Sequence, residues 1–269
     1  MERQLPNLRA NATLLMGRSA PALITVLLLM LGWQAATSIW AIPNWLLPSP
    51  TRILAAMWEW RFILLYDVGV TLRETLVGFG VALLVALPIA AALVSSELLW
   101  RAFYPVLAGV QSVPKNAIAP LLILWFGTGQ LSKVIIAFLI AFFPIVINAV
   151  SGMMLVDTDA HDMMKTLRAS RLQVFWYFRL PNALPFIFAA SKVSITLALV
   201  GAVIGEFVGA DSGLGYVILI SSSQLHTDVA FVAIVLLALI GMGLFSLVGM
   251  VERMAMPWLT TEPEQPVRP

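Results

Sequence analysis

Six long apolar runs constrain the fold of this chain more than any other feature of its sequence. A helix needs about 20 apolar residues to cross the hydrocarbon core of a bilayer, and each run supplies them. The runs extend approximately over Ala20 to Trp40, Val68 to Val94, Phe103 to Phe126, Leu131 to Val156, Ala183 to Phe207 and Val229 to Met250. The sequence therefore predicts an all-α integral membrane protein with six transmembrane helices.

The composition excludes an ordinary soluble domain. Of the 269 residues, 60% are apolar and 11% are charged, whereas soluble domains average about 45–50% apolar and about 25% charged residues. The chain has no cysteine, which excludes disulfides and thiolate metal sites. Its net charge of +2 indicates little, because in a membrane protein the placement of Lys and Arg matters more than their sum.

Basic residues mark alternate ends of the apolar runs. Cytoplasmic loops of membrane proteins carry an excess of Lys and Arg. One set of run ends holds Arg3, Arg9, Arg18, Arg101, Lys165, Arg168, Arg171, Arg179 and Arg253, and the opposite loops hold chiefly Arg52, Arg61 and Lys133. We therefore expect both termini and the loop from Asp157 to Pro181 in the cytoplasm. The first run is too long for a cleaved signal peptide, so we interpret it as a retained anchor.

Three segments are expected along the chain. Residues 1–19 are expected to form a cytoplasmic N-terminus, and residues 20–256 a single six-span domain that includes a two-helix cytoplasmic loop at about 157–181. In residues 257–269, Pro263 and Pro266 lie among acids, which predicts a disordered cytoplasmic tail. The sequence shows no internal repeat of the kind that secondary transporters often have.

A short helix is expected between the first two spans. Ser49 is a suitable N-cap and Pro50 a suitable first-turn residue, so the helix is predicted to run to about Phe62. Its apolar side is expected to carry Ile53, Leu54, Met57 and Trp58. We interpret it as an anchor at the outer membrane interface, where a tryptophan ring can be half hydrated.

The polar loop between the fourth and fifth runs has the pattern of two amphipathic helices. Asp157 can cap the first helix and Ser170 the second, which would end before the new apolar run at Leu180-Pro181. Apolar residues recur with helical spacing at Ala160, Met163, Met164 and Leu167, and again at Leu172, Phe175 and Trp176. We interpret the first stripe as a docking face; an amphipathic loop without a partner is the alternative.

Three prolines interrupt the third run beside polar residues. Freed backbone groups are tolerated at membrane depth only where protein or a water-filled cavity satisfies them. A solute pathway beside this helix therefore competes with a simple kinked packing helix. The prolines are Pro105, Pro114 and Pro120, and the candidate pathway residues are Gln111, Ser112, Lys115 and Asn116.

The fifth run adds two charged candidates for the pathway. Lys192 lies roughly 16 Å along the helix from Pro181, so it either lines the pathway or snorkels to the cytoplasmic interface. Glu206, at the outer end, is expected to be an interface acid or a gate residue. Gly201 and Gly205 have the small-xxx-small spacing that allows helices to pack closely.

No pattern in the sequence indicates an enzyme. A G-x-x-x-x-G-K-[ST] phosphate loop is absent, and His161 and His226 fall in loops on opposite sides, which argues against a His-His metal site. We therefore expect no cofactor or metal bound by this chain. A secondary transporter remains the alternative, and it should carry ionisable pairs within its spans. Lys115 and Lys192 have no obvious intramembrane acid partner.

The loop resembles the one by which permease subunits of ABC importers hold their ATPase. That motif is Glu-Ala-Ala, three residues, Gly, nine residues and Ile-x-Leu-Pro. Counting back from Pro181 places Phe178 at the Ile, Arg168 at the Gly, and Asp162-Met163-Met164 at Glu-Ala-Ala. If the family's glycine is left-handed, Arg168 would cost roughly 1 kcal/mol there, and the turn would be built differently.

The resemblance covers nearly the whole chain and points to one branch of these permeases. The matching segments are Gln111 to Pro120, Trp125 to Gly129, Ala141 to Pro144, Gly201 to Gly209 and Gly213 to Tyr216. They look like the branch that imports nitrate, sulfonates such as taurine, thiamine-pyrimidine precursors and aromatic acids. The segments are specific for the family and not for a substrate.

The resemblance implies how such a subunit would work. It implies a homodimer in the bacterial inner membrane, two cytoplasmic ATPase subunits that use the ATP, and a soluble or lipid-anchored binding protein that delivers the solute. The residues that would contact the ATPase are Asp162, Met163, Met164, Leu167, Arg168 and Ser170. Two copies of Lys115 and Lys192 facing the dimer axis would favour an anion, although a neutral pyrimidine-type solute fits the resemblance equally well.

Overall fold

The computed structural model describes residues 8–155, 163–164 and 166–258, and every regular element in these ranges is a helix. This confirms the all-α fold class. The chain divides into two compact units, the first made of Met1–Arg61 and Ile220–Val232 and the second of Phe62–Leu219 and Ala233–Pro269. Each unit is described by itself.

The first unit contains α1 (Leu8–Ile39), α2 (Pro50–Glu59) and the beginning of α11 (Thr227–Ala255). The Ser49 hydroxyl accepts the N–H of Arg52 at 3.3 Å, and Pro50 begins α2, as predicted. Of the apolar side predicted for α2, Leu54 and Trp58 are 65% and 72% exposed, and its contact with a membrane interface stays a prediction. The buried side is formed by Ile53 and Ala56, three residues apart and therefore on one face of the helix.

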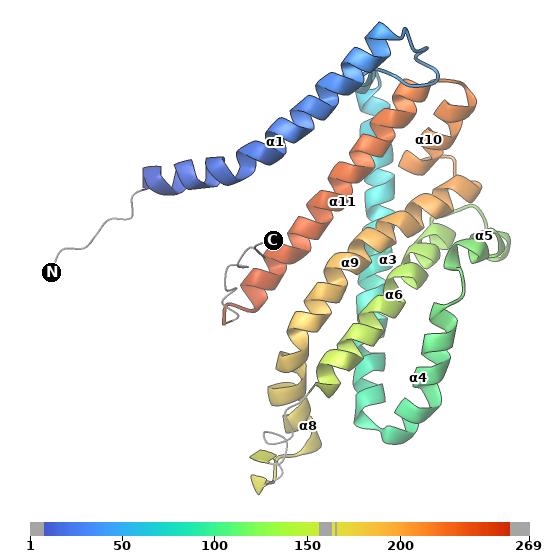
Figure 1. Ribbon diagram of the computed structural model, residues 1–269. Helices are drawn as coiled ribbons and strands as arrows, with labels where there is room; N and C mark the ends of the chain where they lie inside the picture. The colour runs from blue at the N-terminus through green and yellow to red at the C-terminus, as the bar shows by residue number, and fades with distance from the viewer. Residues whose placement is uncertain (1–7, 156–162, 165, 259–269) are drawn as a thin grey trace. The chain divides into compact units, whose positions relative to one another are not determined.

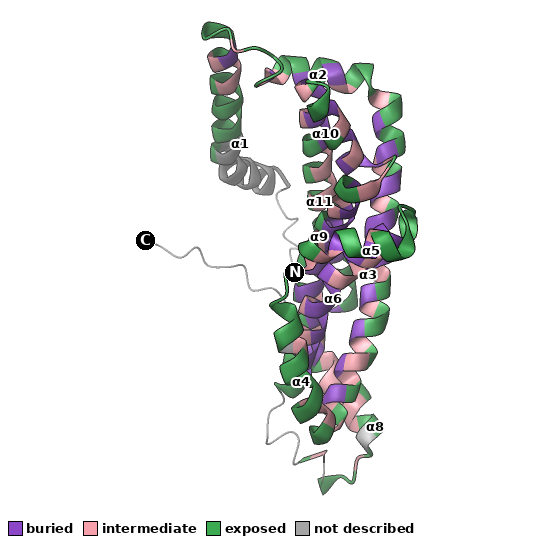
Figure 2. Ribbon diagram, turned by 90° about the vertical axis from the view of Figure 1, so that its right-hand side faces the viewer, coloured by how far each residue is buried: buried purple, intermediate pink, exposed green. Residues whose placement is uncertain are grey.

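The second unit is built around α3 (Arg61–Ser95), α6 (Gln130–Met154) and α9 (Leu180–Gly209). Figure 1 shows α6 and α9 running side by side, and Figure 2 shows that buried residues concentrate on these three helices whereas α4 is mostly exposed. A Cβ on Gly78 would lie 2.6 Å from Ala137 Cβ, and a Cβ on Gly201 would lie 2.8 Å from Ala137 Cα. Small residues therefore bring the three helices together at Ala137, as the spacing of Gly201 and Gly205 predicted.

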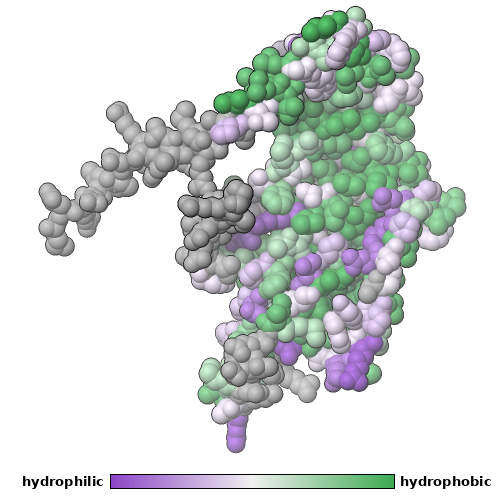
Figure 3. All heavy atoms as spheres, in the orientation of Figure 1, coloured by the Kyte–Doolittle hydropathy of each residue, from purple (hydrophilic) through white to green (hydrophobic). Residues whose placement is uncertain are grey.

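All six predicted apolar runs contain helix, but they do not all qualify as spans. Among the described residues, four helices are long and apolar enough, namely α3, α6, the helical stretch Leu172–Gly209 and α11, and the bent helix pair of the third run would be a fifth if it counts as one span. The first run belongs to α1, within which Ile24–Ile39 is a shorter apolar segment. Hydrophobic side chains cover much of the visible face of the second unit (Figure 3), which suits contact with lipid or with a second copy. The count of six spans stays a prediction.

The third run is not one continuous helix. It consists of α4 (Glu97–Gln111), the 3₁₀ turn η1 (Lys115–Ile118) and α5 (Ala119–Phe126), and its two arms are bent by 81°. The break lies at Pro114, which lacks an N–H and disfavours helical geometry in the residue before it. Pro120 lies in the first turn of α5, where proline is tolerated.

An additional short helix, α10 (Leu214–Ser223), lies in the loop between the fifth and sixth runs. It begins after Gly213, whose φ of +106° is open to glycine and strained for other residues. We did not predict this helix. The signal was available, because the apolar stretch from Leu214 to Ile220 is too short to cross a membrane and yet strongly hydrophobic.

Candidate transport and coupling sites

The turn of the predicted coupling loop is well defined at Arg168. The N–H of Leu167 donates to the Met163 carbonyl at 3.0 Å, and the N–H of Ala169 donates to the Met164 carbonyl at 3.0 Å. Arg168 itself has a φ of +54°. This is a Schellman helix end with Arg168 in its left-handed position. The expectation that the turn would be built differently is therefore wrong: the chain keeps a left-handed turn and places an arginine in it.

The apolar residues before this turn are accessible. Met163 and Leu167 are 60% and 67% exposed, and Met164 is half-buried. An exposed apolar pair at the end of a helix suits docking to a partner. Three predicted residues, Asp157, Ala160 and Asp162, lie outside the described residues.

Ser170 begins the next helix as predicted. Its hydroxyl accepts the N–H of Gln173 at 3.3 Å, and the Gln173 side-chain oxygen accepts the N–H of Ser170 at 2.8 Å. This reciprocal pair is a capping box. The helix then differs from the prediction, because α8 (Arg171–Val174) and the π-helix η2 (Phe175–Arg179) continue without a break into α9.

Pro181 does not separate the second loop helix from the fifth span. It lies in the first turn of α9. Just before it, the π-helix η2 shifts the hydrogen-bond register, so that the Leu180 N–H donates to the Phe175 carbonyl. π-Helical turns of this kind occur often at functional sites. The second half of the loop is thus a rigid extension of α9, with Leu172 and Trp176 70% and 57% exposed.

Two side chains join this extension to the neighbouring helices. Arg179 Nη1 donates to the Val94 carbonyl at 2.9 Å, near the end of α3. Asn182 Nδ2 donates to the Leu155 carbonyl at 2.5 Å, at the end of α6. Both acceptors belong to the helix-terminal carbonyls that have no partner within their own helix. A displacement of the loop therefore acts directly on the ends of α3 and α6.

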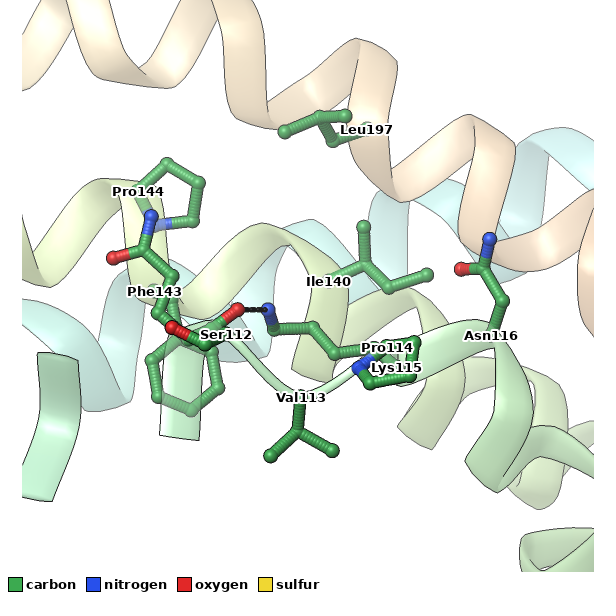
Figure 4. Close-up of a pocket in the computed structure, with 10 residues that line it drawn as sticks. Ser112, Val113, Pro114, Lys115, Asn116, Ile140, Phe143, Pro144 and Leu197 are labelled. Carbon is green, nitrogen blue, oxygen red and sulfur yellow. Dashed lines mark hydrogen bonds between the residues drawn. The ribbon is translucent and has the colours of Figure 1, made fainter. Parts of the chain in front are cut away.

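The four pathway candidates of the third run gather around one hollow. Gln111, Ser112, Lys115 and Asn116 line a cavity of about 390 Å³ together with Phe143 and Pro144 of α6 and Leu197 of α9. We call it the Lys115 hollow. In Figure 4 the Lys115 side chain turns back toward Phe143, and Asn116 points away from it. Gln111, Ser112 and Asn116 are exposed.

The charge of Lys115 is already engaged within the hollow. Its amine donates to the Gln111 carbonyl at 2.9 Å and lies 4.9 Å from the centre of the Phe143 ring. A carbonyl and an aromatic face both stabilise a cation. The hollow thus offers amide and hydroxyl groups beside an aromatic ring rather than a free ammonium group.

Lys192 and Glu206 do not lie in the hollow. Lys192 forms an ion pair with Glu252 of α11, an acid partner that the sequence did not indicate. Glu252 follows the apolar run of α11 by two residues, and such a partner is consistent with the snorkelling alternative, which stays a prediction.

Glu206 is fully buried in a polar cluster between α3, α6, α9 and α10, not at an interface. Its carboxylate accepts the Thr71 hydroxyl at 2.7 Å and the Gly215 N–H at 2.6 Å. Asp67 accepts the Gly213 N–H at 2.8 Å. Two carboxylates therefore hold the backbone where α10 begins, a position that favours negative charge.

The remaining members of this Glu206 cluster are Glu74 and Lys133. Lys133 Nζ lies 3.8 Å from Glu74 Oε1, and their side chains are 2% and 1% exposed. Lys133 was assigned to an outer loop on the basis of charge distribution, and this assignment is wrong because it lies in the first turn of α6. Across the described ranges no three His, Cys, Asp or Glu side chains gather to hold a metal ion.

Comparison with known proteins decides the family. Residues 79–255 match the model of the binding-protein-dependent transport system inner membrane component. The chain belongs to this family. It is 37% identical over 242 residues to the riboflavin transport system permease protein RibX of Chloroflexus aurantiacus, with 87% of this chain and 88% of the relative covered. The subunit is therefore a multi-pass permease component of an ABC importer, and permeases of this family are not themselves enzymes.

Other relatives cover several solutes. The formylaminopyrimidine transport permease protein ThiX of Halalkalibacterium halodurans is 30% identical, covering 86% of this chain and 93% of the relative. The taurine transport system permease protein TauC of Escherichia coli is 26% identical, covering 87% and 88%. Among solved structures, the inward-facing MetNI methionine ABC transporter matches 73% of this chain and 97% of its own with a TM-score of 0.64 at 19% identity, which supports the fold alone.

The family also decides between the two transport mechanisms. The lack of an intramembrane acid partner for Lys115 and Lys192 was the argument against a secondary transporter, and it is weakened because the chain does hold a buried ion pair, between Lys133 and Glu74. Membership of a binding-protein-dependent family excludes the ion-gradient alternative on separate grounds.

Proposed function

We propose that two copies of this chain form the solute pathway of an ATP-driven importer. Two copies of a separate cytoplasmic ATPase bind the loop at about 157–181, and a binding protein outside the membrane delivers the solute. The family description, which names binding-protein-dependent transport, supports the delivery step. The broad exposed apolar surface of the second unit is consistent with burial against lipid and a second copy (Figure 3).

The proposed topology has six spans with both termini in the cytoplasm. The bent pair of α4 and α5 would then form the third span with a re-entrant element, and α10 would lie at the outer end. Lys and Arg at alternate run ends support this orientation. Single cysteines are easily introduced into this cysteine-free chain, and labelling of Ser170→Cys by an impermeant reagent in intact cells would contradict the arrangement.

Coupling to the ATPase is proposed to use the exposed apolar stripe and the turn after it. Met163, Met164 and Leu167 provide the contact, Arg168 and Ser170 shape the turn, and Asp162 extends the contact on the N-terminal side. The observation that carries this assignment is the Schellman turn at Arg168, because it presents the stripe at the position of the family's coupling motif. Arg179 and Asn182 would pass the movement of the loop to α3 and α6.

The decisive experiment is Met164→Asp in proteoliposomes that contain the ATPase and the binding protein. A charge in a desolvated contact costs several kcal/mol, so we expect ATPase association and ATP-dependent uptake to be lost while the permease still inserts. The matched control is Met254→Asp, at a methionine that is 77% exposed near the end of α11. Normal ATPase association in Met164→Asp would remove the loop from the coupling role.

The solute is proposed to be a polar nitrogen heterocycle rather than a simple anion. Relatives named for riboflavin and formylaminopyrimidine transport are 37% and 30% identical to this chain. The Lys115 hollow suits such a solute, because it combines an aromatic ring with amide and hydroxyl groups and its cation is already engaged. Uptake of riboflavin and of pyrimidine precursors should therefore exceed uptake of taurine and nitrate; the reverse order would favour the anion.

A further inference from the structure

A second cavity lies between α9 and α11, away from the proposed pathway. Its volume is about 370 Å³, and its walls include Lys192, Phe245, Ser246, Met250, Glu252 and Arg253. We call it the Lys192 pocket. The apolar run of α11 ends at Met250 and the helix ends at Ala255, so the pocket lies where the apolar part of the helix gives way to charged residues. This is the level of the lipid headgroups.

The charges of the Lys192 pocket do not cancel. Lys192 is paired with Glu252, and both side chains remain 24% and 22% exposed. Arg253 is exposed and makes no ion pair or hydrogen bond with any residue that the structure describes. Two cations therefore face one carboxylate, and a guanidinium group remains available for bidentate binding of a phosphate.

The Lys192 pocket also has an apolar part, which α11 contributes. Phe245 and Met250 are 47% and 60% exposed. A cavity with a basic end and an apolar end, opening at the membrane interface, matches an amphipathic molecule better than a freely soluble ion. Basic pockets between transmembrane helices on the cytoplasmic side are sites of anionic lipid headgroups.

We propose that the Lys192 pocket binds the phosphate headgroup of an anionic phospholipid from the inner leaflet, with the acyl chains along Phe245 and Met250. This site adds a lipid dependence to the proposed function and uses the same topology, in which Arg253 is cytoplasmic. Glu252 limits the affinity of the pocket, because it competes with the phosphate for Lys192. Removal of Glu252 and removal of Arg253 should therefore act in opposite directions.

The test is native mass spectrometry of the purified full-length permease in detergent with equal amounts of phosphatidylglycerol and phosphatidylcholine. Each basic residue at an anionic surface contributes about 1 kcal/mol, so Arg253→Gln should reduce retention of phosphatidylglycerol about fivefold. Glu252→Gln should increase it. Arg101→Gln is the matched control, because Arg101 is an exposed arginine in α4 that pairs only with Glu97 among the described residues.

A second arm separates a lipid from a free phosphate. Inorganic phosphate at millimolar concentration should neither displace phosphatidylglycerol nor raise the unfolding temperature, whereas phosphatidylglycerol should raise it in the wild type and not in Arg253→Gln. If inorganic phosphate stabilised the permease as much as phosphatidylglycerol does, the pocket would be a site for a soluble anion and the lipid proposal would be overturned. Equal losses in Arg253→Gln and Arg101→Gln, or no change in either pocket variant, would overturn the site itself. Either result leaves the proposed importer function untouched, because coupling and uptake are measured separately.

Discussion

The Glu206 cluster and the Lys115 hollow are polar regions of the apolar second unit, and they are built in opposite ways. The Glu206 cluster is closed, because Glu206, Glu74 and Lys133 are at most 2% exposed and its carboxylates accept backbone N–H groups. The Lys115 hollow is open, with Gln111, Ser112 and Asn116 exposed. Closed polar groups in an apolar chain hold the backbone in place, whereas open ones are available to a solute. We therefore expect Glu206 to act in the framework rather than in the pathway lining.

The strongest test of this contrast removes the cation of the closed cluster. Lys133→Met leaves Glu74 buried without its nearest cation, which typically costs about 3–5 kcal/mol. We expect a large loss of unfolding free energy, measured by denaturation of the purified permease in mixed micelles. The double variant Lys133→Met with Glu74→Gln removes both charges and should recover most of that loss.

One result would place the cluster in the pathway after all. If Lys133→Met unfolded like the wild type but abolished uptake, the charge would act on the solute or on gating rather than on stability. The statement that the closed Glu206 cluster serves only as framework would then be wrong.

A smaller loss of unfolding free energy is expected at Gly213, where the carboxylates of the Glu206 cluster lie against the backbone at the start of α10. Its φ is +106°, and a Cβ there would lie 2.3 Å from Glu206 Oε1. A left-handed residue with a Cβ costs about 1–2 kcal/mol, and the collision adds to this. Gly213→Ala should therefore lower the unfolding free energy by more than about 1 kcal/mol. Gly69→Ala is the control, since nothing lies within 4 Å of its Cβ position; equal losses would contradict the proposed fit.

The open region is tested by Lys115→Gln, where we expect lower uptake. The amine donates to the Gln111 carbonyl at 2.9 Å, and a hydrogen bond to a charged group is worth about 1.5–3 kcal/mol, so the unfolding free energy should fall by up to that amount. Uptake per inserted permease in proteoliposomes should fall as well, because this wall of the hollow is no longer held in place. Lys192→Gln should leave the uptake KM unchanged, because Lys192 pairs with Glu252 outside the hollow. If both variants changed the uptake KM equally, both lysines would have to be assigned to the pathway.

The helices were predictable from the sequence because their signals are local. An apolar run of about 20 residues, a Ser49-Pro50 helix start and closely spaced small residues each act within a few turns of the chain. Pro114 even marks the break between α4 and η1, although the sequence alone did not distinguish a kink from an 81° bend. The four pathway candidates of the third run gather in one hollow for the same reason, since they are neighbours in sequence.

The ion pairs were not predictable, because their partners are distant in sequence. Glu74 and Lys133 lie on α3 and α6, and Lys192 and Glu252 on α9 and α11. A prediction from charge distribution along the chain can only assign each of these residues to a loop or to the end of an apolar run. Only the packing of helices shows that Lys133 is buried among acids. For the same reason the sequence did not indicate that two of the six pathway candidates, Lys192 and Glu206, lie apart from the other four.

The smallest effect is expected at Arg168. Its left-handed turn is open to solvent, whereas the left-handed turn at Gly213 is packed against the Glu206 carboxylate. Both residues have positive φ values, +54° and +106°, but Arg168 is exposed and its Cβ meets no buried carboxylate. An open turn tolerates an arginine at a cost of about 1 kcal/mol, whereas the closed turn requires glycine. Arg168→Gly should therefore raise the unfolding free energy by about 1 kcal/mol and leave ATP-dependent uptake intact. Lost uptake with normal stability would mean that the Arg168 side chain itself contacts the ATPase. The arginine would then be present at this position for binding and not merely tolerated by the turn.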